Sequence, residues 1–267
     1  MQQFLTWFTN QPHRYKIFIA GNHDMTLDPQ CQRGRSTISQ DQQLLNSQRC
    51  RELVKSTTGA VYLQDTSTSI GDITFYGTPW QPAFWGAFNL PRRGAALQEK
   101  WDAIPADVDV LLTHTPPHGV LDYVPSAGGH VGCELLRSAV EARVRPRMHI
   151  FGHIHECGGQ TCHHEFNDGD ADWTRRDEGN TSCTGGNSGS GNAFAVTNIA
   201  STSSGAGAGA GAGAGDSSGV ASHTPPRTSC LFVNAASCPV HVAGPLHLPV
   251  VVFLPFDKSL PASVIED

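Results

Sequence analysis

The stretch Phe18-Ile19-Ala20-Gly21-Asn22-His23-Asp24 runs from apolar residues into a glycine and three polar side chains. We expect residues 15–20 to form a buried strand, because a short apolar run closed by a glycine turn is typical of that element. In open α/β sheets, ligand-binding sites lie at the carboxyl ends of the strands, which is where these polar side chains occur. Asn22 offers an amide oxygen to a cation, His23 can bind a metal or pass a proton, and Asp24 can hold an imidazole in one tautomer.

Two later stretches repeat this design. A strand predicted over residues 108–113 ends at His114, and a strand over 148–151 is followed by Gly152-His153-Ile154-His155. Because residues i and i+2 of an extended segment point the same way, the last two histidines should share a face. A single histidine is as often a hydrogen-bonded core residue as a ligand, but three similar strand ends argue against coincidence. The predicted ligands, which suit Mn, Fe or Zn, are Asn22, His114, His153 and His155.

The remaining pattern predicts one α/β domain over residues 1–267, with a core at 3–157 and 230–256. Segment 64–72, which contains Gly71-Asp72, is interpreted as a turn between two strands. Residues 158–229, rich in Gly, Ala and Ser, predict a disordered low-complexity insertion with at most a short strand at 194–199. Helices are predicted at 4–9, 41–56, 97–101 and 133–142, and further strands at 60–63, 73–77, 231–234 and 250–254.

Composition restricts the function classes. A net charge of −6 with scattered Lys and Arg gives no basis for binding nucleic acid or a membrane surface. The sequence shows no signal peptide and no apolar run near the roughly 18 residues of a spanning helix. Eight cysteines without framework spacing are expected to be free thiols in a reducing compartment. We therefore expect a cytoplasmic protein, whose oligomeric state the sequence leaves open.

Two features near these strand ends allow two interpretations each. The aromatic residues Phe84, Trp85 and Phe88 are expected to form a lid on the core, and the alternative is a wall beside a substrate. His118 follows the strand that ends at His114. It is a candidate substrate contact, or else an exposed loop histidine.

The three site stretches resemble the third, fourth and fifth blocks of the calcineurin-like metallophosphoesterases. Residues 77–82, 113–117, 130–133 and 151–156 narrow the resemblance to the small metallophosphoesterase-domain-containing proteins, which are similar to class III cyclic-nucleotide phosphodiesterases. The resemblance covers about residues 3–156 and 231–238, and it excludes the insertion.

This resemblance implies a four-layer αββα sandwich with two metal ions between its layers. It implies that Asn22, His114 and His153 bind one metal and that His155 binds the other. His23, oriented by Asp24, would protonate the leaving oxygen or stabilise the transition state. The reaction implied is in-line attack of hydroxide on a phosphodiester or nucleotide clamped by both ions.

The sequence departs from the family at its start. The family opens with Asp-x-His and Gly-Asp blocks, which supply the bridging carboxylate and two further ligands, and neither block precedes Asn22 in this chain. We therefore expect an N-terminally incomplete fold, one weakly held ion or none, and impaired hydrolysis. Either Met1 is not the true start, or this is a short form without hydrolysis.

Two rival functions stay open. One is a non-catalytic protein that binds a nucleotide or a partner. The other is a structural zinc site at Cys157, Cys162, His163 and His164.

Overall fold

The computed structural model describes residues 1–31, 39–166, 183–184, 196–198, 227–236, 251–253 and 262–264. The helices are α1 (Gln2–Thr9), α2 (Gln40–Ser56), α3 (Ala95–Asp102), α4 (Glu134–Ala139) and the π-helix η2 (Val140–Val144), with 3₁₀ turns η1 (Pro125–Ala127) and η3 (His155–Cys157). The longer strands are β3 (Thr66–Ile70), β4 (Ile73–Thr78), β7 (Val110–Thr113), β10 (Met148–Phe151), β11 (Thr161–Glu165) and β14 (Ser229–Asn234). The shorter strands are β1 (Ile17–Phe18), β2 (Val61–Tyr62), β5 (Gln81–Pro82), β6 (Asn89–Leu90), β8 (Tyr123–Val124), β9 (Gly129–His130), β12 (Cys183–Thr184), β13 (Val196–Asn198), β15 (Val251–Phe253) and β16 (Ser263–Val264).

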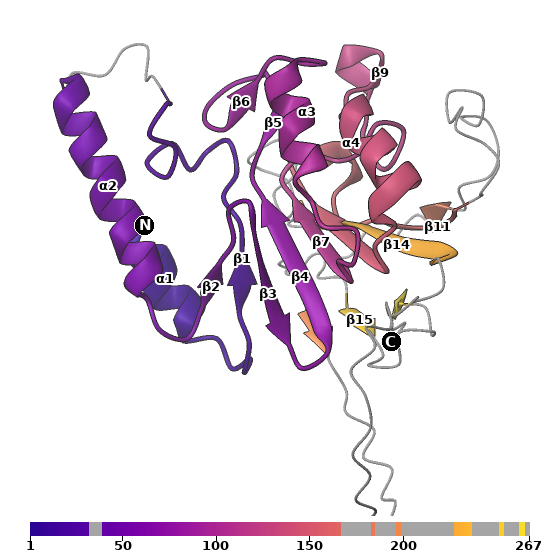
Figure 1. Cartoon of the computed structure of the whole chain (residues 1–267), viewed down its shortest axis with the longest axis horizontal. Helices are drawn as coiled ribbons and strands as arrows, with labels where there is room; N and C mark the ends of the chain where they lie inside the picture. The colour runs from indigo at the N-terminus through magenta and orange to yellow at the C-terminus, as the bar shows by residue number, and fades with distance from the viewer. Residues whose placement is uncertain are drawn as a thin grey trace, which may run out of the picture.

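A seven-stranded sheet forms the centre of the described structure, in the order β12-β11-β14-β10-β7-β4-β3 (Figure 1). Its middle strands β14, β10, β7 and β4 run parallel, and β11 and β3 pair antiparallel to their neighbours. Parallel strands are stable when both of their faces are covered, which fits the near-continuous apolar runs of β7, β10 and β14. The carboxyl ends of β7 and β10 therefore lie side by side, with His114 just beyond the first.

The two faces of this sheet bury different apolar side chains. On one face Leu111 and Phe232 pack with Trp101 of α3 and Leu136 of α4, and Figure 1 shows these two helices over β4 and β7. On the other face Val110 and its neighbours pack with Ala262, next to β16. The alternation follows from the two-residue period of a strand. The fold is thus mixed α/β, which confirms the expected fold class, and α3 and α4 cover one face of the central sheet.

The strand that leads to Asn22 stands apart from this sheet. In the described residues β1 pairs only with β2, in parallel, and Figure 1 shows both beside α1 and α2. A third apolar cluster joins Leu5 of α1, Val54 of α2, Ala20 and the buried Phe88. Packing of these helices and of the aromatic loop therefore fixes the end of β1, without hydrogen bonds to the central sheet.

Several sequence predictions are confirmed, some with shifted ends. The strand over 148–151 and the turn at Gly71-Asp72 appear as predicted, and a short strand, β13, lies within 194–199. The helix predicted at 133–142 starts one residue later as α4 and continues as η2 to Val144. The strand over 15–20 shrinks to β1.

Two predictions about irregular segments were wrong. Segment 64–72 is not all turn, because its residues Thr66–Ile70 form β3 at the edge of the sheet. The expected insertion does not begin at Gly158, because Thr161–Glu165 form β11, paired with β14. Both strands are rich in Thr, Ser or His, and an edge or half-exposed strand tolerates such polar residues. The rest of 158–229 lies largely outside the described residues.

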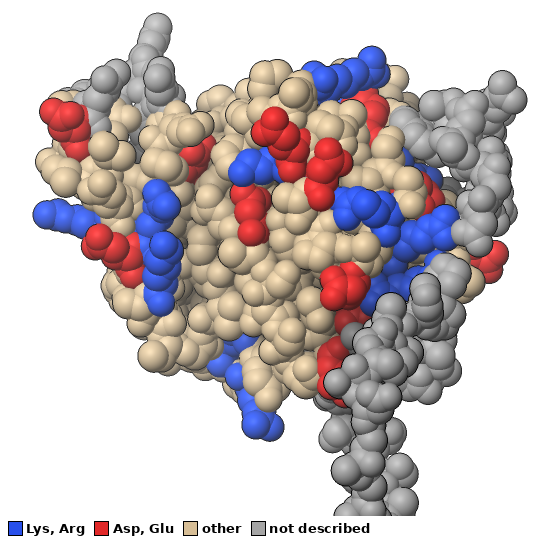
Figure 2. Space-filling view, in the orientation of Figure 1, with Lys and Arg blue, Asp and Glu red and all other residues tan. Residues whose placement is uncertain are grey.

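Charged side chains are mixed on the surface. Figure 2 shows Lys and Arg interspersed with Asp and Glu around a broad area that carries neither. Among the described residues, no helix combines the length and the apolar character that crossing a membrane requires. The six cysteines with described side chains form no disulfide.

Candidate metal and phosphate site

Gly21 brings the end of β1 into contact with the end of β7. A Cβ atom on Gly21 would lie 2.6 Å from Cε1 of His114, so only glycine lets the imidazole pack against this backbone. Asn22 follows directly and is 3% exposed. The glycine of Gly-Asn-His-Asp therefore has a packing role, and it allows residues 92 positions apart to meet.

Asn22 and His114 make the central contact of the site. The Oδ1 atom of Asn22 lies 2.8 Å from Nε2 of His114, and the backbone N of Asn22 lies 3.2 Å from the same nitrogen. The Nδ2 group of Asn22 donates to the carbonyl oxygen of Trp85 at 3.1 Å, which keeps Oδ1 turned toward the imidazole. An unprotonated Nε2 and Oδ1 are both electron-pair donors, so a cation between them would satisfy both.

His153 extends this pair. Its ring centroid lies 4.7 Å from that of His114. The expectation that 152–155 is extended was wrong, because β10 ends at Phe151, His153 has a φ of 69° and η3 begins at His155. His153 and His155 therefore follow the strand in a turn, although each still acts electrostatically on the His114 ring.

Burial and mutual repulsion keep these imidazoles neutral. The pKa of His114 lies well below its usual range, first because the ring is buried and then because His153, His23 and His155 oppose a second positive charge. Burial, with His155 and His23, lowers the pKa of His153 to about 4. Neutral imidazole is the form that binds metal, so these rings are ready ligands at neutral pH.

His23 and Asp24 do not form the pair that the sequence suggested. The carboxylate of Asp24 accepts from the backbone N of Gly21 at 2.8 Å and closes the turn after β1, and it makes no hydrogen bond to His23 among the described contacts. Burial raises the pKa of this carboxyl group. His23 is exposed, and its ring packs at a centroid distance of 5.1 Å against Trp85.

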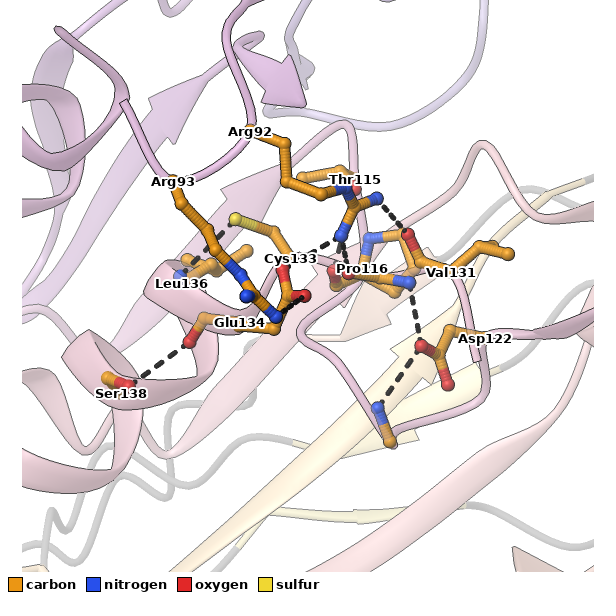
Figure 3. A network of polar contacts seen from close by, with 12 residues as sticks. Arg92, Arg93, Thr115, Pro116, Asp122, Val131, Cys133, Glu134, Leu136 and Ser138 are labelled. Atoms are coloured by element: carbon orange, nitrogen blue, oxygen red, sulfur yellow. Dashed lines mark hydrogen bonds and ion pairs between the residues drawn. The ribbon is translucent and has the colours of Figure 1, made fainter. Parts of the chain in front are cut away.

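His118 lies in a second cluster, on the loop that follows β7. Its ring is 5.8 Å from that of His130, whose Nδ1 lies 2.5 Å from the fully buried Asp122. Figure 3 shows how this loop is held: Asp122 accepts from the backbone N of Gly132, and Arg92 donates to the carbonyl oxygens of Val131 and Gly132. His118 thus sits on a braced loop and does not line the cavity at the strand ends.

A cavity of about 330 Å³ opens between the strand ends. Its floor is apolar and includes Ile19, Leu112 and Ile150, which are partly buried side chains of the β1, β7 and β10 segments. The lining also includes the polar residues Asn22, His23, Asp24 and His114. The cavity is thus bounded by the three strand ends that the sequence pattern indicates.

These residues offer donor atoms for one metal ion but do not by themselves show a metal site. Asn22, His114 and His153 supply neutral oxygen and nitrogen donors close together. In the part of the chain that the structure describes, no group of three or more His, Cys, Asp or Glu side chains is spaced to hold a metal. Among the same residues no second site forms around His155, and the Asp24 carboxylate is engaged by the backbone of Gly21.

Comparison with known proteins identifies the family. A family model described as "Calcineurin-like phosphoesterase" matches residues 2–157, more than half of the chain. The chain belongs to the calcineurin-like phosphoesterase family. The match includes Asn22, His114, His153 and His155.

Curated relatives match more than half of this chain. "Metallophosphoesterase domain-containing protein 1" of Homo sapiens is 44% identical over 163 residues, which are 58% of this chain and 49% of the relative. A UPF0046 protein of Caenorhabditis elegans is 41% identical over 161 residues, which are 56% of this chain and 40% of the relative. The chain therefore spans half or less of the length of these relatives.

The alternative zinc site is not formed in this calcineurin-like phosphoesterase. Burial alternates along β11, so Cys162 and His164 face inward and His163 faces solvent on the opposite side. Nε2 of His164 lies 2.8 Å from Glu141, which also lies 2.7 Å from Nε of Arg137. These residues belong to a buried polar cluster under η2.

The carboxylate of Glu141 is expected to make the stability of this chain sensitive to acid. Although burial raises its pKa, contacts with His164 and Arg137 outweigh burial and bring the pKa below the usual 4.5. Because the unfolded chain then binds more protons below about pH 4.5, acid should progressively remove the stability that this carboxylate supplies.

We therefore expect Glu141→Gln to flatten the decline of unfolding free energy as the pH falls below about 5. Urea titrations at each pH measure this slope. Glu165→Gln, which alters an exposed carboxylate on β11, is the matched control. Equal slopes in wild type and Glu141→Gln would contradict the assignment.

Sequence reasoning missed the residues that position the ligands. The Trp85 carbonyl orients the Asn22 amide, and Gly86 packs against the Asn22 backbone. The sequence signal for this contact was Gly86, a glycine directly after two aromatic residues at 84–85. Only the folded loop shows that this glycine touches Asn22. The lid interpretation of that loop was right for Phe88, which is fully buried, and wrong for Phe84 and Trp85, which are exposed.

Proposed function

We propose that this 267-residue chain is a metal-dependent phosphoesterase whose substrate class is phosphodiesters of the cyclic-nucleotide kind, and that it catalyses their hydrolysis weakly. The observation that carries the proposal is the convergence of Asn22, His114 and His153, of which Asn22 and His114 line a cavity.

The side chains of the site would have different roles, namely metal binding and proton donation. Asn22, His114 and His153 would hold one divalent ion, with Mn²⁺, Fe²⁺ or Zn²⁺ as candidates. Such an ion polarises phosphoryl oxygens and offsets their charge. His23, exposed beside the cavity, can protonate a leaving oxygen, and the packing of its ring against Trp85 limits its orientation.

Weak catalysis follows from the donor set. Three neutral ligands leave the full charge of a divalent ion uncompensated, and His155 alone does not make a second site. The in-line reaction of two-metal enzymes uses both ions to stabilise the attacking and the leaving oxygen. A single loosely held ion supplies part of that stabilisation.

A second candidate is a nucleotide-binding protein without turnover. It is favoured by the lack of a three-ligand His, Cys, Asp or Glu group among the described residues. In that case the cavity would bind the phosphate ligand while the ion is dispensable.

Hydrolysis of two substrates distinguishes these functions. We expect slow, EDTA-sensitive hydrolysis of bis(4-nitrophenyl) phosphate in Mn²⁺, and slower hydrolysis of cyclic AMP, whose alkoxide leaving group needs a proton. His23→Ala should reduce turnover of cyclic AMP more than turnover of the activated ester. Turnover that is unchanged by EDTA would contradict the proposal. Binding of AMP without turnover of either ester would favour the second candidate.

A further inference from the structure

The loop between β5 and β6 exposes two large aromatic side chains. Phe84 is 75% exposed and Trp85 is 52% exposed, whereas Phe88 of the same loop is fully buried. Large aromatic residues carry most burial per side chain, so an adjacent exposed pair indicates a contact surface when its location supports one. Here the location is the edge of the candidate site.

The backbone beneath these two rings is well anchored. The N of Phe84 donates to Oδ1 of Asn89 at 3.0 Å, and Nδ2 of Asn89 donates to the carbonyl oxygen of Gly86 at 2.7 Å. The N of Ala87 donates to the Asn22 carbonyl oxygen at 2.8 Å, and the Trp85 carbonyl oxygen accepts from the Asn22 side chain. The exposed rings therefore stand on a loop that is fixed to the candidate metal ligand Asn22.

Each ring also contacts a histidine of the site. The Trp85 ring lies 5.1 Å from the His23 ring at an interplanar angle of 60°. The Phe84 ring lies 5.5 Å from the His153 ring at 81°. Trp85 thus contacts a histidine that lines the cavity, Phe84 contacts the candidate ligand His153, and both rings leave much of their surface to solvent.

We propose that Phe84 and Trp85 form a stacking surface for a planar base, which would bind the nucleobase of a ligand whose phosphate lies near His23 and His114. This inference rests on the proposed function for the phosphate and adds the recognition of the base. Exposed aromatic rings on a fixed backbone bind bases without ordering a loop, and stacking tolerates any base because each has a π face.

Three ligands separate the base from the phosphate: AMP, ribose 5-phosphate and adenosine, each titrated into the full chain by calorimetry in Mn²⁺. We expect AMP to bind about 10- to 100-fold more tightly than ribose 5-phosphate. The double variant Phe84→Ala/Trp85→Ala should reduce this ratio to about one, because the affinity for AMP falls to that for ribose 5-phosphate.

Two further variants make the test specific. Phe84→Leu/Trp85→Leu keeps apolar bulk without aromatic rings. Like Phe84→Ala/Trp85→Ala, it should lose the preference for AMP over ribose 5-phosphate. Tyr15→Ala removes an aromatic side chain that is 50% exposed outside this loop and should bind like wild type. Equal wild-type affinity for AMP and ribose 5-phosphate, or a preference that survives in the alanine pair, would overturn the proposal.

Adenosine distinguishes this inference from the proposed function. One outcome is that adenosine binds, ribose 5-phosphate does not, and Phe84→Ala/Trp85→Ala weakens adenosine binding. That outcome would support the stacking surface and contradict the proposed phosphate site. A chain that binds none of the three ligands refutes the stacking surface.

Discussion

Replacing Gly86 by alanine is expected to lower the unfolding free energy by about 2–5 kcal/mol. Gly86 has a φ of +88°, a region that costs residues with a side chain about 1–2 kcal/mol. Its added Cβ would also lie 2.0 Å from the carbonyl oxygen of Asn22. That contact is impossible, so the loop and the end of β1 must separate, which costs about 1–3 kcal/mol more.

Gly59→Ala is the matched control for this prediction. Gly59 has a φ of +83° but nothing within 4 Å of the added Cβ, so its variant shows the cost of backbone strain alone. Urea unfolding of both variants measures the difference. If Gly86→Ala costs no more than Gly59→Ala, the aromatic loop does not pack on Asn22 as described.

Replacing His114 by alanine is expected to weaken Mn²⁺ binding by at least about 100-fold. His114 contacts Asn22 at 2.8 Å and packs at 4.7 Å from His153, so it joins the two other donors. Loss of a residue that merely supports a metal ligand already costs about 10- to 100-fold in affinity, and loss of a ligand should cost no less. Electron paramagnetic resonance of free Mn²⁺ measures the affinity.

The control for the metal prediction is His163→Ala. His163 is an exposed histidine on β11, on the face opposite Cys162 and His164. Its replacement should leave Mn²⁺ affinity unchanged. Similar affinities of His114→Ala and His163→Ala would mean that Mn²⁺ binds elsewhere on the chain.

The core strands were predictable because successive residues along them are buried, on alternate faces of the sheet. Val110 and Leu111 face opposite sides of the sheet and both are buried, which gives the continuous apolar run that the sequence shows. Met148–Phe151 was predicted residue for residue for the same reason. In contrast, β3 and β11 depend on neighbouring strands for their pairing, and their own residues show little apolar pattern.

The site was predictable in its residue types and less so in its geometry. Asn22 and His114 meet as the strand-end pattern suggests. The left-handed backbone at His153 is a local conformation that an L-residue rarely adopts, so no pattern of residues indicates it. The contact between Trp85 and Asn22 joins residues 63 positions apart and depends on packing of the whole loop.

The central claim is that Asn22, His114 and His153 bind one divalent ion. Anomalous diffraction at the manganese edge, from crystals of the 267-residue chain grown in Mn²⁺, tests it most directly. One peak within ligand distance of Asn22 Oδ1 and the His114 and His153 rings is the predicted result. A map with no peak there, or with its strongest peak at other residues, would contradict the claim.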